Sequence, residues 1–127
     1  MYKLSHRSIN RLNGVKAILI VIATDSIKDA PYDFGIADLG GLRTAVEQHR
    51  LYVNKKSQKD GCFRKSKHQE GEAFDIVCYR NGEITWDAEV FTEVANHILK
   101  LAKDKYNVEL IWGGHWKSFK DMPHFQI

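Results

Sequence analysis

The chain has 127 residues, 43% hydrophobic and 28% charged, which is enough for one domain with its own core. Its net charge of +3 is too small to indicate a dedicated nucleic-acid-binding protein, and two cysteines exclude a disulfide-based scaffold. The longest apolar run, residues 17–23, is too short to cross a bilayer, and we expect no secretion signal.

The first half of the chain has the pattern of three helices and one short strand. Ser5 and Thr44 are suitable N-caps, and Thr44 with Glu47 three residues later has the pattern of a capping box. Apolar residues recur at helical spacing over residues 15–27. The predicted elements are helices over residues 6–13, 15–27 and 44–55 and a strand over residues 34–36. The polar stretch that follows, residues 55–69, is predicted to be a loop.

The second half has the pattern of antiparallel strands around one long helix. Asn81-Gly82 between two apolar runs is the strongest short signal of a β-hairpin, and Asp87 is a suitable N-cap for the helix after it. The predicted elements are strands over residues 73–79, 84–86 and 108–112, a helix over residues 88–105 and an extended segment over residues 123–127. Together they indicate an α+β domain, in which N-terminal helices and one long central helix pack on a small antiparallel sheet.

Two histidines and one aspartate are candidate metal ligands: His68, Asp75 and His124. A His–Asp–His set leaves zinc an open fourth position for water, as a catalytic site requires. Zinc lowers the pKa of such a water toward about 7, and a separate carboxylate then accepts its proton. Asp121, three residues before His124, is the candidate for that base. Spacing alone does not justify this choice, because a single histidine is more often an ordinary surface or hydrogen-bonded residue.

Local sequence motifs strengthen the choice. Residues 66–75 read S-x-H-x-x-G-x-A-x-D, which resembles the zinc signature of the D-alanyl-D-alanine carboxypeptidase and VanY-like metallopeptidase family. Residues 121–126 resemble that family's second signature, D-x-P-H-F, and residues 113–119 resemble its short phage-endolysin branch, the L-alanyl-D-glutamate peptidases. Weaker similarities over residues 4–15 and 34–48 extend the resemblance over nearly the whole chain.

The resemblance implies a role for each matching residue. His68, Asp75 and His124 match the zinc ligands, and Asp121 matches the catalytic acidic residue, although many relatives have Glu there. Arg43 matches the family's arginine, which holds the substrate carbonyl or stabilises the oxyanion; a guanidinium beside zinc suits that developing charge. The implied fold is the one that Hedgehog domains share with D,D-peptidases.

Other residues near the motifs are candidates for binding or for the core. His115 and Trp116 are candidate substrate contacts, with a surface-loop histidine and a core-closing tryptophan as the alternatives. Trp112 and Trp86 are expected in the core. The cationic residues between positions 55 and 67 are expected either to be solvated or to attract anionic polymers of the cell wall or outer membrane.

Four further residues around the first motif are assigned as follows. Ser66 is either a hydrogen-bond partner behind the metal ligands or an ordinary loop serine. Glu72 is not expected to be a ligand, because a regular strand points it away from the face of Asp75. Cys62 and Cys78 are expected to be buried free thiols, with a disulfide between them as the alternative.

The resemblance thus predicts a phage endolysin that uses Zn²⁺ to hydrolyse the L-alanyl–D-glutamate bond of peptidoglycan stem peptides and to lyse the host. Residues 1–127 are expected to be one catalytic domain without a cell-wall-binding module, monomeric, without nucleic acid or a membrane anchor. It would wait in the host cytoplasm and act in the periplasm. The alternatives are a VanY-type D,D-carboxypeptidase, a non-catalytic zinc-stabilised binding module and, on charge alone, a nucleic-acid binder. Asp121 beside His124 favours the enzyme, because a binding module needs no base.

Overall fold

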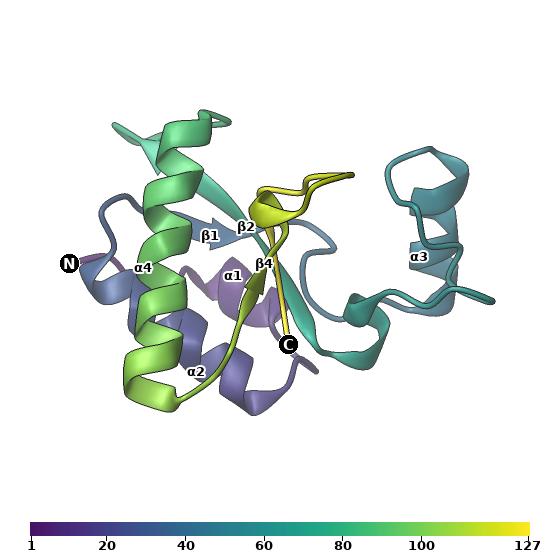
Figure 1. Ribbon diagram of the computed structural model, residues 1–127, viewed down its shortest axis with the longest axis horizontal. Coiled ribbons are helices and arrows are strands. Elements are labelled where there is room, and N and C mark those ends of the chain that lie inside the picture. Colours follow the sequence, from purple (N-terminus) through teal and green to yellow (C-terminus); the bar gives the residue numbers. More distant parts are fainter.

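Five short strands form one antiparallel sheet with helices around it, as a computed structural model of residues 1–127 shows (Figure 1). The helices are α1 (His6–Arg11), α2 (Ala17–Ser26), α3 (Ala45–Val53) and α4 (Ala88–Tyr106). The strands are β1 (Phe34–Ile36), β2 (Ala73–Arg80), β3 (Glu83–Thr85), β4 (Ile111–Trp112) and β5 (His124–Gln126). Short 3₁₀ turns lie at Ile27–Asp29, Lys67–Glu70 and Gly113–His115. The predicted α+β class is therefore confirmed. None of the helices combines the length and the apolar character that crossing a bilayer requires.

Strand β2 is the centre of the sheet, because it pairs with three other strands along its length. Its first residues, Ala73–Asp75, pair with β5, and its later residues pair with β1 and with β3. The turn from β2 to β3 is the predicted Asn81-Gly82 hairpin, with φ values of 54° and 80° that suit a type I′ turn. Strand β4 completes the sheet on the far side of β5.

The apolar core lies between α2, α4 and the sheet. The apolar face of α4 repeats at helical spacing, and six of its residues are buried: Val90, Phe91, Val94, Ala95, Ile98 and Ala102. Across from it, α2 contributes the buried residues Leu19, Ile22 and Ala23. Burying one large aliphatic or aromatic side chain contributes about 1.5–3 kcal/mol, so this cluster is the main source of stability.

Helix α3 and the chain after it form a separate polar lobe, residues 45–66, which stands apart from the other helices in Figure 1. The Thr44–Glu47 capping box is present as predicted. A buried glutamine, Gln48, holds the lobe together, because its amide donates to the Ser57 hydroxyl at 2.8 Å and to the Lys59 carbonyl at 2.9 Å. Hydrogen bonds therefore organise this lobe where the rest of the domain uses apolar packing.

Three predictions about the second half of the chain were wrong in detail. Trp86 is 64% exposed and not in the core, because β3 ends at Thr85 and the indole lies beyond it, stacked on the ring of Phe91. Of the predicted strand 108–112 only the last two residues pair, since β5 offers partners to those two alone. Asp87 occupies the N-cap position of α4, but its carboxylate pairs with Arg80 at 2.8 Å and does not cap.

The cysteines are both free, which excludes the disulfide, but the expectation that both are buried holds only for Cys78. Cys78 lies in the core, where burial raises the pKa of its thiol to about 12. Cys62 is exposed, because it lies on the polar lobe.

A carboxylate on α2 ties the ends of the two core helices together and generates a prediction about pH. Asp25 accepts hydrogen bonds from Lys105 and Tyr106 of α4, each at 2.6 Å, and these bonds lower the pKa of Asp25 below its ordinary value of 3.8. We expect Asp25→Asn to reduce the free energy of unfolding by about 1 kcal/mol at pH 7. A carboxylate with a lowered folded-state pKa stabilises above the unfolded-state pKa and loses that effect as pH falls, so the difference should shrink below about pH 4.

Urea unfolding of both proteins at pH 7 and at pH 3 measures this difference. A gap that stays constant across this range would show that the ion pair does not stabilise the fold.

Candidate metal centre and cleft

The pairing of β2 with β5 places two of the predicted ligands opposite each other. Asp75 and His124 are partners in the antiparallel register, although 49 residues separate them in the chain. The side chains of directly opposed residues lie on the same face of a sheet, within about 5.5 Å of each other at Cβ. The strand register alone therefore brings a carboxylate and an imidazole together.

The third predicted ligand, His68, comes from the 3₁₀ turn just before β2. Ser66 begins this turn, and its hydroxyl accepts a hydrogen bond from the backbone N–H of His68 at 3.1 Å. Gln69 completes a second capping box, and Gly71 ends the turn with a φ of 70°. Ser66 is thus neither an ordinary loop serine nor a partner of a ligand side chain, because it caps the turn that carries His68. The turn was missed in the predicted loop, although S-x-x-Q is a capping-box pattern.

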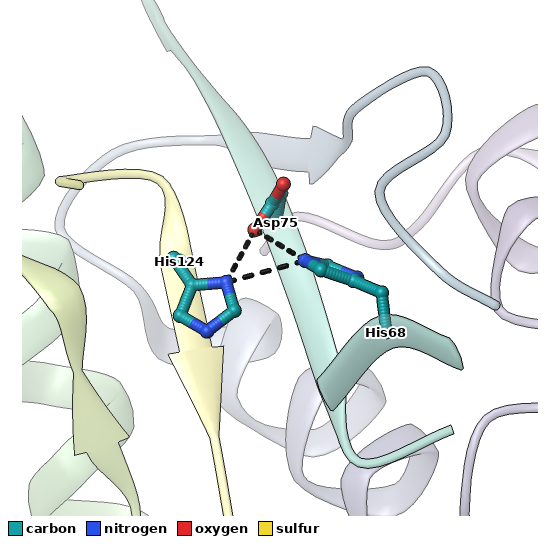
Figure 2. Close-up of side chains that lie close together, drawn as sticks. All are labelled: His68, Asp75 and His124. Carbon is teal, nitrogen blue, oxygen red and sulfur yellow. Dashed lines mark hydrogen bonds and ion pairs between the residues drawn. The ribbon is translucent and has the colours of Figure 1, made fainter. Parts of the chain in front are cut away.

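Three potential ligand atoms form a nearly equilateral triangle (Figure 2). His68 Nε2 lies 3.1 Å from Asp75 Oδ1, His124 Nδ1 lies 3.0 Å from the same oxygen, and the two nitrogens are 3.2 Å apart. Ligand atoms that surround zinc tetrahedrally at about 2.0–2.1 Å lie about 3.3 Å from one another. The donor set and its spacing therefore fit a zinc ion with one position left open.

Hydrogen bonds on the outer side of each ligand direct its free lone pair inward. His68 Nδ1 donates to the carbonyl of Gly41 at 2.9 Å, and His124 Nε2 donates to the side-chain oxygen of Gln126 at 2.8 Å. Because a carbonyl oxygen only accepts, these partners fix the tautomers and leave His68 Nε2 and His124 Nδ1 without protons. Such outer hydrogen-bond partners are typical of metal sites and raise the affinity of the site for its metal ion.

Arg43 holds the third ligand in the same way. Its guanidinium donates to Asp75 Oδ2 at 3.0 Å, so that only Oδ1 of Asp75 faces the two histidines. Further bonds to the Leu39 carbonyl at 2.7 Å and to Gln48 at 3.0 Å fix the guanidinium, and its side chain is 11% exposed. The structure therefore brings Arg43 to the site, where its guanidinium is bonded to the candidate ligand Asp75.

The ionisation of the site suits a divalent cation. Burial opposes the charge on Asp75, but hydrogen bonds from His124 and His68 outweigh it and hold the pKa of this carboxyl well below its ordinary value. Burial also opposes the charge on His124, yet the Asp75 carboxylate raises the pKa of this imidazole. Because zinc binds the ionised carboxylate and the neutral imidazole, metal binding at this site depends on pH.

Asp121, the predicted base, lies just beside the triangle. Its carbonyl accepts from the backbone N–H of His124 at 3.1 Å, and its own N–H donates to Gly113 at the same distance. A Cβ on Gly113 would lie 2.3 Å from that Asp121 carbonyl, so a glycine is required here. Partial desolvation and the negative charge of Asp75 raise the pKa of the Asp121 carboxyl, which makes it a better proton acceptor.

The triangle lies in a cleft of about 930 Å³ between the polar lobe and the C-terminal loop. Asp121 and Trp116 line it, and the Trp116 ring lies 5.3 Å from that of His124. His115 is not brought to the cleft: it is exposed, and its ring packs edge-on against Trp112 at 4.7 Å. Trp112 is buried as predicted, with its indole N–H donating to the Met122 carbonyl.

Glu72, which was predicted not to be a ligand, lies outside the triangle, and so does Cys78. Glu72 pairs with Lys16 at 2.6 Å and with Lys67 at 3.5 Å, and Cys78 is in the core. Two groups that hold the histidine rings in place were not predicted from the sequence. Gln126 could have been found, because a residue two positions from His124 on a strand shares its face. The Gly41 carbonyl could not, because a backbone acceptor leaves no mark in the sequence.

Comparisons with known proteins point to one activity. The family model described as phage L-alanyl-D-glutamate peptidase matches residues 1–125. The L-alanyl-D-glutamate peptidase of Escherichia phage T5 is 33% identical and covers 94% of this chain and 85% of its own length. The peptidoglycan L-alanyl-D-glutamate endopeptidase CwlK of Bacillus subtilis is 29% identical, over 81% of this chain and 68% of its own. The crystal structure of the L-Ala D-Glu endopeptidase ChiX of Serratia marcescens superposes with a TM-score of 0.86 at 27% identity, over 99% of this chain and 90% of its own.

The triangle predicts how this protein binds metal. Calorimetric titration of metal-free protein with Zn²⁺ should give one site per chain. Asp75→Asn should weaken it at least about 100-fold, because loss of a ligand costs more than loss of an outer hydrogen-bond partner. Glu72→Gln is the matched control, since it removes a nearby carboxylate outside the triangle and should leave the affinity unchanged. Equal affinity of Asp75→Asn and the wild type would contradict the assignment.

Proposed function

The chain belongs to the phage L-alanyl-D-glutamate peptidase family and is a peptidase of peptidoglycan; we propose that it cleaves the L-alanyl–D-glutamate bond with one zinc ion held by His68, Asp75 and His124. The observation that carries this proposal is the triangle of ligand atoms, whose sides of 3.0–3.2 Å suit zinc. When bound, zinc supplies Lewis acidity, which polarises the amide carbonyl and acidifies a water toward a pKa of about 7.

Asp121 is the proposed general base. It takes a proton from the water that attacks the L-alanine carbonyl carbon, and its raised pKa favours this transfer. When the C–N bond breaks, Asp121 returns the proton to the nitrogen of D-glutamate, which leaves as an amine. One carboxyl group thus serves both proton transfers, and no further acid is needed.

Arg43 is proposed to have two roles, one toward the metal ligand Asp75 and one toward the substrate carbonyl. Its bond to Asp75 Oδ2 keeps the ligand oriented, as described above. Two of its five N–H groups have no protein partner, and the residue lines the cleft. These N–H groups are proposed to stabilise the negative charge that develops on the carbonyl oxygen. Trp116 is proposed as a wall for the stem peptide.

The predicted alternatives have less support. All three relatives named above carry L-alanyl–D-glutamate cleavage in their names, which disfavours a D,D-carboxypeptidase. A binding module would need no carboxylate with a raised pKa beside the metal ligands. We therefore propose that the protein is a phage endolysin, made in the host cytoplasm and active on peptidoglycan in the periplasm, where this cleavage lyses the cell.

Digestion of purified peptidoglycan tests this function. Mass spectrometry of fragments should show new D-glutamate amino termini with zinc-loaded protein and none after chelation. Asp121→Asn should lower kcat at least about 100-fold, because general acid–base catalysis contributes about 10²- to 10⁴-fold, while the zinc content stays at one. Asp104→Asn, an equivalent change on the outer face of α4, should leave kcat unchanged.

Other products would contradict the proposal in distinct ways. Release of D-alanine alone would identify a carboxypeptidase. Folded, zinc-loaded protein that releases no fragment would identify a binding module.

A further inference from the structure

Most cations of this protein that lack an acidic partner lie in one place. Ten of the nineteen Lys and Arg residues form no ion pair within 4.0 Å. Six of these ten line the cleft of the candidate metal centre: Lys55, Lys56, Lys59, Arg64, Lys65 and Lys120. The two other cleft cations, Arg43 and Lys67, are paired with Asp75 and Glu72. Unpaired positive charge is thus concentrated where the substrate must bind.

Five of the six unpaired cations belong to the polar lobe, on the wall that faces the C-terminal loop. The lobe holds them on an ordered backbone. One carboxylate oxygen of Asp60 accepts three backbone N–H groups, from Cys62, Phe63 and Arg64, each at 2.9 Å. The Gln48 side chain fixes the Lys59 carbonyl. The positive side chains therefore extend from a preorganised wall.

The chemistry of the proposed substrate supplies a matching anion. D-glutamate has two carboxyl groups, and a linear peptide uses only one of them to continue the chain. The other stays free and negatively charged, and it lies on the residue whose amide nitrogen is released. A carboxylate thus enters the cleft next to the scissile bond. The cleft itself carries only three acidic residues, and two of them, Asp75 and Asp121, are assigned to the metal centre.

We propose that the cationic wall, defined as Lys55, Lys56, Lys59, Arg64 and Lys65, binds the free carboxylate of D-glutamate and so selects an acidic residue after the scissile bond. This inference rests on the proposed function. Charge-assisted contacts of this kind provide specificity, because a substrate without the carboxylate leaves the wall uncompensated. Arg43 and Lys67 are not part of this wall, since Arg43 is assigned to Asp75 and the reacting carbonyl oxygen, and Lys67 pairs with Glu72.

Two synthetic peptides test the inference. They share an L-alanyl–D-glutamate bond and differ only in the free carboxyl group of D-glutamate, which is a carboxylate in one and a carboxamide in the other. Zinc-loaded wild-type protein should cleave the carboxylate peptide with a kcat/KM at least about tenfold higher, as expected for a charged contact. The combined variant Lys56→Gln, Lys59→Gln and Lys65→Gln should reduce this preference to within about twofold.

A matched triple variant controls for net charge. Lys3→Gln, Arg7→Gln and Lys117→Gln removes three exposed, unpaired cations outside the cleft and should keep the wild-type preference. Equal cleavage of both peptides by the wild type would overturn the inference and leave the proposed function intact. Cleavage of neither would overturn both. A wall variant that keeps the preference but binds whole peptidoglycan less well would also overturn it, in favour of attraction to a cell-wall polymer.

Discussion

The pairing of β2 with β5 is the constraint on which the candidate site depends. Asp75 and His124 meet only because this register places them opposite each other. The side-chain period of a strand is two, so a slip of one residue would turn one of them to the other face of the sheet. Several contacts oppose such a slip. Phe74 stacks on Phe125 with ring centroids 5.3 Å apart, and β4 pairs with the outer edge of β5.

The two sides of the molecule around this pairing are held together by different interactions. Apolar packing between α2 and α4 stabilises one side, and buried polar side chains organise the other. Arg43 links the two, because its guanidinium bonds both to Gln48 of the lobe and to Asp75 of the sheet. The candidate metal centre therefore lies between the apolar core and the polar lobe, and every buried polar side-chain atom has a hydrogen-bond partner. A site preorganised in this way loses little free energy in reorganisation when a cation binds.

Much of this arrangement could be predicted from sequence, where the signal is local. The Asn81-Gly82 hairpin and the Thr44 capping box follow from turn and cap chemistry over a few residues. The three candidate ligands were identified because two motifs resemble a known family, not from their spacing, and the structure brings them together. Trp86 was misplaced, because burial depends on which strand lies at the edge of the sheet, and the sequence does not show that. The cationic wall had two alternative interpretations, since tertiary contacts alone bring it to the same cleft as Asp121.

The most direct test of the account is X-ray absorption spectroscopy at the zinc edge of the reconstituted protein. The account predicts four ligands at about 2.0–2.2 Å, two imidazole nitrogens and two oxygens, one from Asp75 and one from water. A sulfur ligand at about 2.3 Å, or a shell of oxygen atoms without imidazole, would contradict it. Either result would mean that the triangle of His68, Asp75 and His124 is not the metal centre.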